Sequence, residues 1–170
     1  MKIIYSFFFL LFLLTSCNTK KEVKKRAQEP TKKELSDEKL LDLVQKQTFN
    51  YFWEGAEPNS GLARERLHMD NIYPTTPKNT VTIGGSGFGF MAILVGIERN
   101  FITKGEATER YHKMVDFLAK ADRFHGAWPH WLNGETGKTV PFSKNDDGAD
   151  LVETAFLVQG LLTVSEYFKG

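Results

Sequence analysis

Apolar residues recur at helical spacing in four segments of the chain, and polar stretches rich in glycine and proline separate them. The first segment begins at Asp37, where Ser36 is a suitable N-cap, and it should stop before Gly55. The second runs from Phe88 to about Glu98 and is apolar nearly all round. A helix without a polar face is typical of a buried position, so we expect this segment inside the domain.

The third segment has the clearest start signal. Thr103 and Glu106 have the spacing of a capping box for a helix that reaches about Ala121. The fourth helix is predicted from about 149 to 168. Four helices with no strong strand between them indicate an all-α class.

Two connections are too long or too patterned to be simple turns. Residues 55–85 hold several proline, glycine and asparagine residues, and a loop of this length is more often functional than idle. Residues 127–142 place Asn133-Gly134 between short aromatic and β-branched runs. This second pattern predicts a hairpin loop.

The N-terminus has the pattern of a secretory signal. Lys2 precedes the apolar stretch 3–14, which is shorter than the roughly 20 residues that a membrane span needs. Leu-Thr-Ser-Cys follows and resembles the lipobox of bacterial lipoproteins, with Cys17 as the lipidated residue. We therefore predict a signal peptide over 1–16 and a lipid-anchored protein of the bacterial cell envelope. A plain secretory signal with a chance cysteine is the alternative. Cys17 is the only cysteine, so the chain forms no internal disulfide.

Residues 17–36 are predicted to be a disordered basic tether. Seven Lys or Arg and three Glu lie between 18 and 36, with almost no apolar side chains. Setting these and Lys2 aside leaves 14 basic and 18 acidic residues from Asp37 onward, a net charge near −4. Such an acidic, aromatic-rich part is a poor candidate for nucleic acid binding, which favours basic faces.

The region from Asp37 to Gly170 is expected to be a fragment of a larger helical domain. Two of its four helices are nearly all apolar, which is more hydrophobic surface than about 134 residues readily cover. A complete small α-domain is the alternative.

Carboxylates gather before the fourth helix. Asp146, Asp150 and Glu153 stand four and three residues apart, so a helix beginning near Ala149 would place them on one face. Clustered like charges often persist because a ligand binds them or because their protons are used. Helix capping is the alternative, although it accounts more easily for one or two acids than for the four that Asp147 completes.

Aromatic and polar residues on the loops complete a pattern suited to sugars. Sugars have apolar C–H faces and many hydroxyl groups, and glycoside cleavage needs two carboxyl groups. The candidate substrate-binding residues are Trp53, Glu54, Arg64, Phe88, Trp128, His130 and Trp131. A core position is the alternative for any single tryptophan, above all for Trp53. The run 128–131 in a hairpin is harder to explain that way.

Other chemistries fit poorly. Residues 87–92 match the dinucleotide pattern G-x-G-x-x-A, but the acidic residue expected about 20 positions later falls inside the third helix. The segment around Gly148 lacks the acids of a calcium loop. The four histidines (His68, His112, His125 and His130) show no metal spacing. We therefore expect no metal and no cofactor.

Six motifs resemble the glucoamylase-like domain of bacterial glycoside hydrolases, with glycoside hydrolase family 144, the endo-β-1,2-glucanases, as the nearest relatives. They are residues 52–54 (FWE), 60–64 (SGLAR), 82–89 (TIGGSGFG), 125–131 (HGAWPHW), 141–143 (PFS) and 146–154 (DDGADLVET). The resemblance covers about 37–170. It implies the N-terminal part, about four helices and a hairpin loop, of an (α/α)6 toroid.

The resemblance also implies an activity, hydrolysis of a β-glucan with β-1,2 linkages. Together with the lipobox it predicts a lipid-anchored glycoside hydrolase. We expect Asp150 and Glu153 to be the acid/base candidates and Asp146 to orient water or a hydroxyl group. The resemblance favours inversion, and it places a further essential glutamate beyond residue 170. A noncatalytic glycan-binding lipoprotein is the alternative, because it needs the aromatics without the three acids. A scaffolding lipoprotein would bind no sugar.

Overall fold

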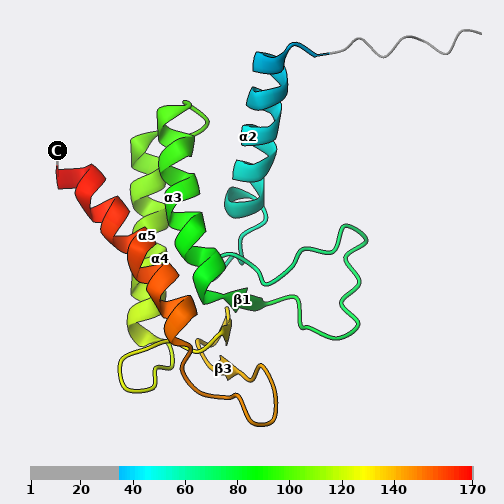
Figure 1. Ribbon diagram of the computed structural model, residues 1–170, viewed down its shortest axis with the longest axis vertical. Coiled ribbons are helices and arrows are strands. Elements are labelled where there is room, and N and C mark those ends of the chain that lie inside the picture. The colour runs from blue at the N-terminus through cyan, green and yellow to red at the C-terminus, as the bar shows by residue number, and fades with distance from the viewer. Residues whose placement is uncertain (1–34, 170) are drawn as a thin grey trace, which may run out of the picture. The chain divides into compact units, whose positions relative to one another are not determined.

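The computed structural model describes residues 35–169 and shows a helical unit with one small sheet (Figure 1). The predicted signal peptide, Cys17 and most of the tether lie outside these residues. Four helices occur within the described part: α2 (Asp37–Trp53), α3 (Ile83–Glu98), α4 (Lys104–Lys120) and α5 (Leu151–Lys169). Three short strands accompany them: β1 (Thr80–Thr82), β2 (Trp131–Asn133) and β3 (Thr139–Val140). The predicted all-α class is confirmed. None of the helices between residues 35 and 169 is long and apolar enough to span a membrane.

α4 begins and ends where the sequence predicted. The Thr103 hydroxyl accepts a hydrogen bond from the Glu106 N–H at 3.2 Å, and the Glu106 carboxylate accepts one from the Thr103 N–H at 2.7 Å. This reciprocal capping box satisfies two N–H groups that would otherwise lack partners. α2 also follows Ser36 and stops before Gly55, as predicted, but the Ser36 side chain makes no capping hydrogen bond.

α3 begins five residues earlier than predicted, at Ile83 rather than Phe88. Gly84 and Gly85 disfavour a helix start on propensity alone, which is why the sequence placed the beginning after them. A carboxylate from α5 accepts a hydrogen bond from the Gly84 N–H at 2.8 Å. A partner distant in sequence therefore supplies the cap that the local sequence lacks.

α3 and α5 pack against each other through two glycines. A Cβ atom on Gly87 would clash with the backbone of Phe156, and one on Gly160 would clash with the carbonyl of Gly87. The helices can therefore approach until backbone meets backbone. The buried core includes residues of both helices, and its largest fully buried apolar side chains are Phe90, Leu62, Ile83, Ile93, Met114, Leu132 and Leu157.

The strands form one antiparallel sheet in the order β1-β2-β3. The predicted hairpin is β2 and β3, with Trp131 opposite Val140 and Leu132 opposite Thr139. The turn is longer than a two-residue Asn-Gly turn. The residue in it with a left-handed backbone is Gly137, with φ of 70°, and not Gly134. The Asn133 side chain accepts hydrogen bonds from the N–H groups of Glu135 and Thr136, each at 3.0 Å, and so fixes the turn.

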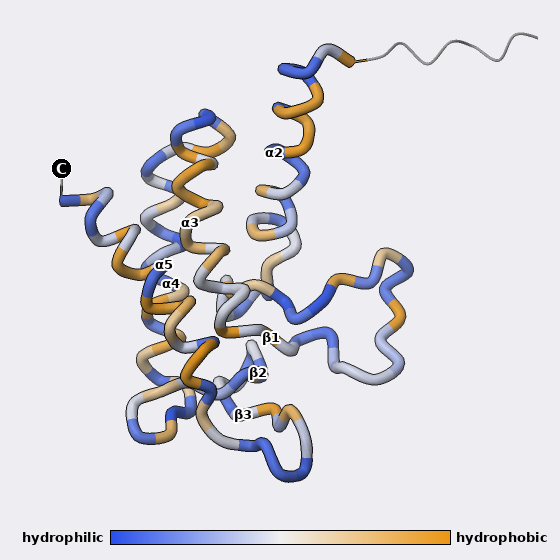
Figure 2. Tube along the Cα trace, in the orientation of Figure 1, coloured by the Kyte–Doolittle hydropathy of each residue, from blue (hydrophilic) through white to orange (hydrophobic). Residues whose placement is uncertain are grey.

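Hydrophobic residues recur along α3 and α5 (Figure 2), and several of their side chains are exposed. Leu151 is 77% exposed and Leu162 is 55% exposed on α5, and Phe88 is 49% exposed on α3. So many exposed apolar side chains on neighbouring helices are unusual for a helical domain whose surface faces water alone.

Candidate active site

Asp150 is the N-cap residue of α5 rather than a residue on its surface. Its Oδ1 atom accepts hydrogen bonds from the N–H groups of Val152 and Glu153, each at 2.9 Å. Its own N–H donates to the carbonyl of Trp128 at 2.8 Å, which ties the start of α5 to the loop before β2. The capping role that the sequence left open is therefore present for this acid.

The prediction that Asp146, Asp150 and Glu153 share one helical face is wrong. α5 begins at Leu151, not near Ala149, so only Glu153 lies within it. A β-bridge between Pro129 and Ala149 keeps the chain extended up to the cap, and this pairing cannot be read from local propensity.

His130 contacts the other oxygen of Asp150. The distance from His130 Nδ1 to Asp150 Oδ2 is 3.2 Å, and both side chains are partly buried. The Glu153 N–H, with smaller contributions from His130 and the Val152 N–H, holds the pKa of the Asp150 carboxyl below its usual value, although partial burial raises it. Asp150 is therefore a carboxylate at neutral pH. As a hydrogen-bond acceptor it favours the His130 tautomer with a proton on Nδ1, which directs Nε2 away from the carboxylate.

Three aromatic rings lie together beside this pair. The ring centroid of His130 is 5.1 Å from Trp131 and 4.8 Å from Phe142, and Trp131 and Phe142 are 5.0 Å apart. Phe142 lies in the loop that follows β3, and 52% of its surface is exposed. It was not among the predicted site residues, although it lies in the motif 141–143 (PFS), one of the six that carry the family resemblance.

Glu153 lies on the first turn of α5 and reaches the start of α3. Its Oε2 atom accepts hydrogen bonds from the Gly84 N–H at 2.8 Å and from the Thr82 hydroxyl at 3.1 Å. A Cβ atom on Gly84 would clash with this carboxylate. Thr82 and Gly84 were not predicted as partners of the acids, because 69 or more residues separate them from Glu153 in the chain.

Asp146 is exposed in the loop between β3 and α5. Its backbone pairs with Ser143, with N–O distances of 3.1 and 3.2 Å, in a tight turn. Among residues 35–169, its carboxylate makes no hydrogen bond. The three predicted acids are therefore held differently, one as a cap, one against α3 and one on an exposed turn.

Two predicted sugar platforms serve as packing residues. Trp53 stacks on Phe49, with centroids 5.8 Å apart, and the Arg110 guanidinium lies 4.2 Å from its ring centroid. The Trp128 indole N–H donates to the carbonyl of Leu118 at 3.2 Å. Both indoles are partly buried and pack against the core, the position that the sequence analysis gave as the alternative to a sugar platform.

The remaining predicted residues divide into one buried and two exposed. Arg64 is 7% exposed, and its guanidinium donates to the carbonyls of Gly55 and Lys78, which closes the base of the long loop. Glu54 and Phe88 are exposed, and the Phe88 ring lies 5.4 Å from that of Phe156.

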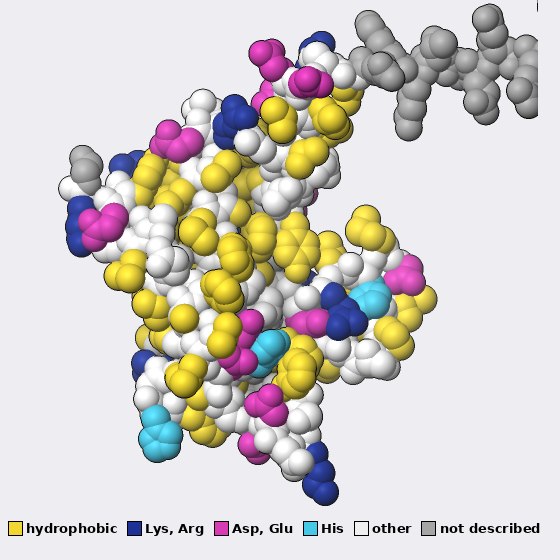
Figure 3. Space-filling view, in the orientation of Figure 1, with side chains coloured by type: hydrophobic (Ala, Val, Ile, Leu, Met, Phe, Trp, Pro, Cys, Tyr) yellow, Lys and Arg dark blue, Asp and Glu magenta, His cyan; other side chains and the backbone are white. Residues whose placement is uncertain are grey.

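The side chains brought together are therefore Asp150, His130, Trp131, Phe142 and Glu153, near the starts of α3 and α5 and the end of the sheet. Figure 3 shows acidic and histidine side chains beside hydrophobic ones on the face that includes the start of α5. Fixed carboxylates beside aromatic rings can hold a polyol and carry proton transfer. Within residues 35–169, no three His, Cys, Asp or Glu side chains are grouped as a metal site.

No family model matches the chain. It is, however, 54% identical over 136 residues to an exo-β-1,2-glucooligosaccharide sophorohydrolase (non-reducing end) of Parabacteroides distasonis, an alignment that covers 79% of this chain and 18% of that protein. The endo-β-1,2-glucanase of Chitinophaga pinensis, solved with sophorotriose and glucose, is 61% identical with a TM-score of 0.78 over 79% of this chain and 32% of that one. A Bacteroides caccae structure named as a glucoamylase is 62% identical with a TM-score of 0.77, over 78% of this chain and 32% of that one.

The chain is a homologue of one part of the β-1,2-glucanases and glucoamylase-like proteins. It spans about a fifth of the curated relative and about a third of the solved ones. The four helices are thus part of a glucoamylase-like toroid, consistent with its N-terminal part, as the sequence predicted. Helices that pair with further helices in a toroid also account for the exposed apolar side chains of this glucanase homologue.

Proposed function

We propose that the full-length protein hydrolyses a β-1,2-linked glucan, with Asp150, Glu153 and His130 in its substrate cleft. The observation that carries this proposal is the pairing of His130 with Asp150, whose carboxyl pKa is held below its usual value, beside Trp131 and Phe142. Its context supports it, since relatives 53–61% identical to the chain are named for β-1,2-glucan chemistry.

The hydrogen bonds divide the roles of the acids. A general acid must carry a proton at the working pH, and the lowered pKa of Asp150 makes it a poor donor. We assign Asp150 the role of a base or positioning carboxylate, which holds His130 with Nε2 free to bond a sugar hydroxyl. Proton donation then belongs to a carboxyl group other than Asp150.

Glu153 remains a candidate for direct action. Its Oε2 atom is used by Gly84 and Thr82, and within the described residues Oε1 makes no hydrogen bond. Asp146 lies on an exposed turn in the loop between β3 and α5, and it would orient water or a hydroxyl group once substrate is bound. Trp131 and Phe142 are the proposed sugar platforms.

The anchor is a separate part of the proposal. The apolar stretch 3–14 and the Leu-Thr-Ser-Cys sequence support a lipid on Cys17 and a position in the bacterial cell envelope. Residues 18–36 would then be the link between the membrane and the helical domain.

Reducing-end release from purified full-length protein tests the activity. We expect products from linear β-1,2-glucan and none from β-1,3- or β-1,4-glucan. Asp150→Asn should lower turnover by about 10²-fold or more if the carboxylate acts in the reaction. Asp122→Asn is the matched control, because Asp122 also accepts a backbone N–H, that of Thr139, but pairs with Lys138 outside the site.

The outcomes separate the candidate functions. Equal turnover in Asp150→Asn and Asp122→Asn would remove Asp150 from the reaction. Glucan binding without products, from the unaltered protein, would favour the noncatalytic glycan-binding alternative.

A further inference from the structure

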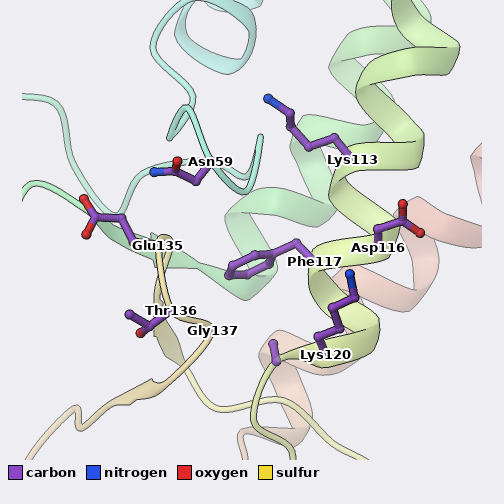
Figure 4. A pocket seen from close by; sticks show the side chains of 9 residues that line it. Asn59, Lys113, Asp116, Phe117, Lys120, Glu135, Thr136 and Gly137 are labelled. Atoms are coloured by element: carbon purple, nitrogen blue, oxygen red, sulfur yellow. The ribbon is translucent and has the colours of Figure 1, made fainter.

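A cavity of about 380 Å³ lies between α4, the loop 57–61 and the turn of the β2–β3 hairpin (Figure 4). It shares no lining residue with the candidate active site. Its lining includes Lys113, Asp116, Phe117, Lys120, Glu135 and Thr136. The volume lies within the range of about 300–1,000 Å³ that is usual for small-molecule sites.

On the side of the cavity formed by α4, an aromatic ring lies among charged side chains. Lys113, Asp116, Phe117 and Lys120 are three, one and three residues apart, which places them on one face of the helix. In Figure 4 the Phe117 ring projects from α4 toward the hairpin turn, with Glu135 and Thr136 opposite. A sugar ring could therefore lie on the aromatic face while its hydroxyls reach the charged side chains.

Buried hydrogen bonds hold the wall formed by the loop 57–61. The Glu57 side chain is 1% exposed and accepts hydrogen bonds from the N–H groups of Asn59 and Ser60 and from both of their side chains. A Cβ atom on Gly134 would clash with Glu57, so the loop is pressed against the hairpin. Lys113 also donates to the carbonyl of Pro58 at 2.9 Å, which joins α4 to this loop.

The hairpin wall is held as firmly. The Asn133 side chain fixes the N–H groups of Glu135 and Thr136, and the Asp122 N–H donates to the carbonyl of Gly137 at 2.9 Å. Both walls are therefore formed before any ligand arrives. A preformed cavity reduces the entropy cost of ordering its walls on binding.

The charges of the lining cancel. The two positive charges of Lys113 and Lys120 balance the two negative charges of Asp116 and Glu135, so neither an anion nor a cation gains a net attraction. A neutral polyol gains from both signs, because its hydroxyls donate to carboxylates and accept from ammonium groups. Phe117 supplies the apolar surface that the C–H face of a sugar needs.

We propose that this cavity is a second glucan-binding site, separate from the candidate active site, which holds one end of a chain or a second chain. The sugar class of its ligand rests on the proposed function. The existence of the site rests on the cavity, its preformed walls and its balanced charge.

Binding of a β-1,2-glucooligosaccharide to the full-length protein tests the proposal. Calorimetry should give roughly tenfold weaker binding for Phe117→Leu, which keeps apolar volume but removes the ring. The double variant Lys120→Ala with Glu135→Ala should weaken binding similarly while keeping the net charge. Glu109→Ala is the control, because Glu109 is exposed on α4 outside the cavity. Binding should also change little with salt, since the ligand is neutral.

Hydrogen exchange locates the ligand independently. The oligosaccharide should protect the backbone of 113–121 and 133–138, and it should do so equally in Asp150→Asn. Unchanged binding in both cavity variants, or no protection of these segments, would overturn the proposal. If the unaltered protein binds the oligosaccharide and protects these segments but releases no reducing ends, the proposed hydrolysis is wrong and the second binding site is still supported.

Discussion

The carboxylate of Glu153 closes the start of a helix 69 residues earlier in the chain, since its Oε2 atom lies 2.8 Å from the N–H of Gly84. An anion is stabilised at a helix N-terminus by unpaired N–H groups and by the helix dipole. Glu153 is therefore a structural partner of α3 as well as a candidate for chemistry.

Substituting Glu153 separates these two roles. Glu153→Gln keeps an oxygen that can accept from Gly84 but removes the titratable proton. It should cost up to about 1 kcal/mol of unfolding free energy, the usual contribution of a charge at a helix end. Turnover should fall by about 10²–10⁴-fold if Glu153 transfers a proton. Denaturant unfolding and reducing-end release measure the two effects.

Glu153→Ala is the companion variant, because it removes the acceptor as well. It should cost about 1–3 kcal/mol, since the Gly84 N–H loses its partner. Normal turnover in the glutamine variant, with a loss of stability in the alanine variant, would make Glu153 a cap alone.

The contact between α3 and α5 gives a second prediction. Gly160→Ala places a Cβ atom against the carbonyl of Gly87, so the helices must move apart. Overpacking of this kind typically costs about 1–3 kcal/mol, which thermal unfolding would report. Gly105→Ala is the matched control, because Gly105 lies on α4 with no tight contact. It should be neutral or stabilising by up to about 1 kcal/mol. Equal melting temperatures for the two variants would contradict the packing described here.

We expect the free energy of unfolding to depend on pH through the Glu57 carboxyl group. Burial raises the pKa of its carboxyl, but the hydrogen bonds from Ser60 and Asn59 outweigh burial and hold the pKa below its usual value of 4.5. The folded state therefore binds this proton more weakly than the unfolded state. The stabilisation is present above about pH 4.5 and is lost as pH falls through the lowered pKa.

Glu57→Gln should remove this dependence. Unfolding free energies measured from pH 7 downward should show a smaller loss below about pH 4.5 in the variant than in the unaltered protein. At pH 7 the variant should be less stable by about 1–3 kcal/mol, because an amide cannot accept all the hydrogen bonds of the carboxylate. Parallel curves for the two proteins would show that Glu57 does not titrate with unfolding.

The predicted lipid anchor is tested at Cys17. Cys17→Ser should leave the protein unprocessed and move it from the membrane to the soluble fraction, because lipid chains supply the membrane affinity. Fractionation and mass measurement of the processed N-terminus check both effects. Lys20→Ala, in the tether, should be processed normally. Unchanged membrane partitioning of Cys17→Ser would refute the lipoprotein interpretation.

Much of the fold was predictable because its signals are local. The capping box of Thr103 and Glu106 and the periodic apolar residues after Asp37 placed two helices within a residue or two. Asn133-Gly134 correctly indicated a hairpin, although the turn itself depends on Gly137. Short-range hydrogen bonds and side-chain spacing determine such features, so a single sequence contains them.

The sequence by itself therefore determined the helical class, the identity of the acidic and aromatic residues, and the likeness to glucoamylase-like proteins. Only the tertiary structure decided how those residues are used. Asp150 caps α5 and holds His130, Glu153 caps α3, and Trp53 and Trp128 belong to packing. The pairing of Asp150 with His130 and of Glu153 with Gly84 depends on hydrogen bonds between residues 20 and 69 positions apart, which no local pattern encodes. The close glycine contact of α3 with α5 holds together the two helices whose starts are joined by Glu153 and Gly84.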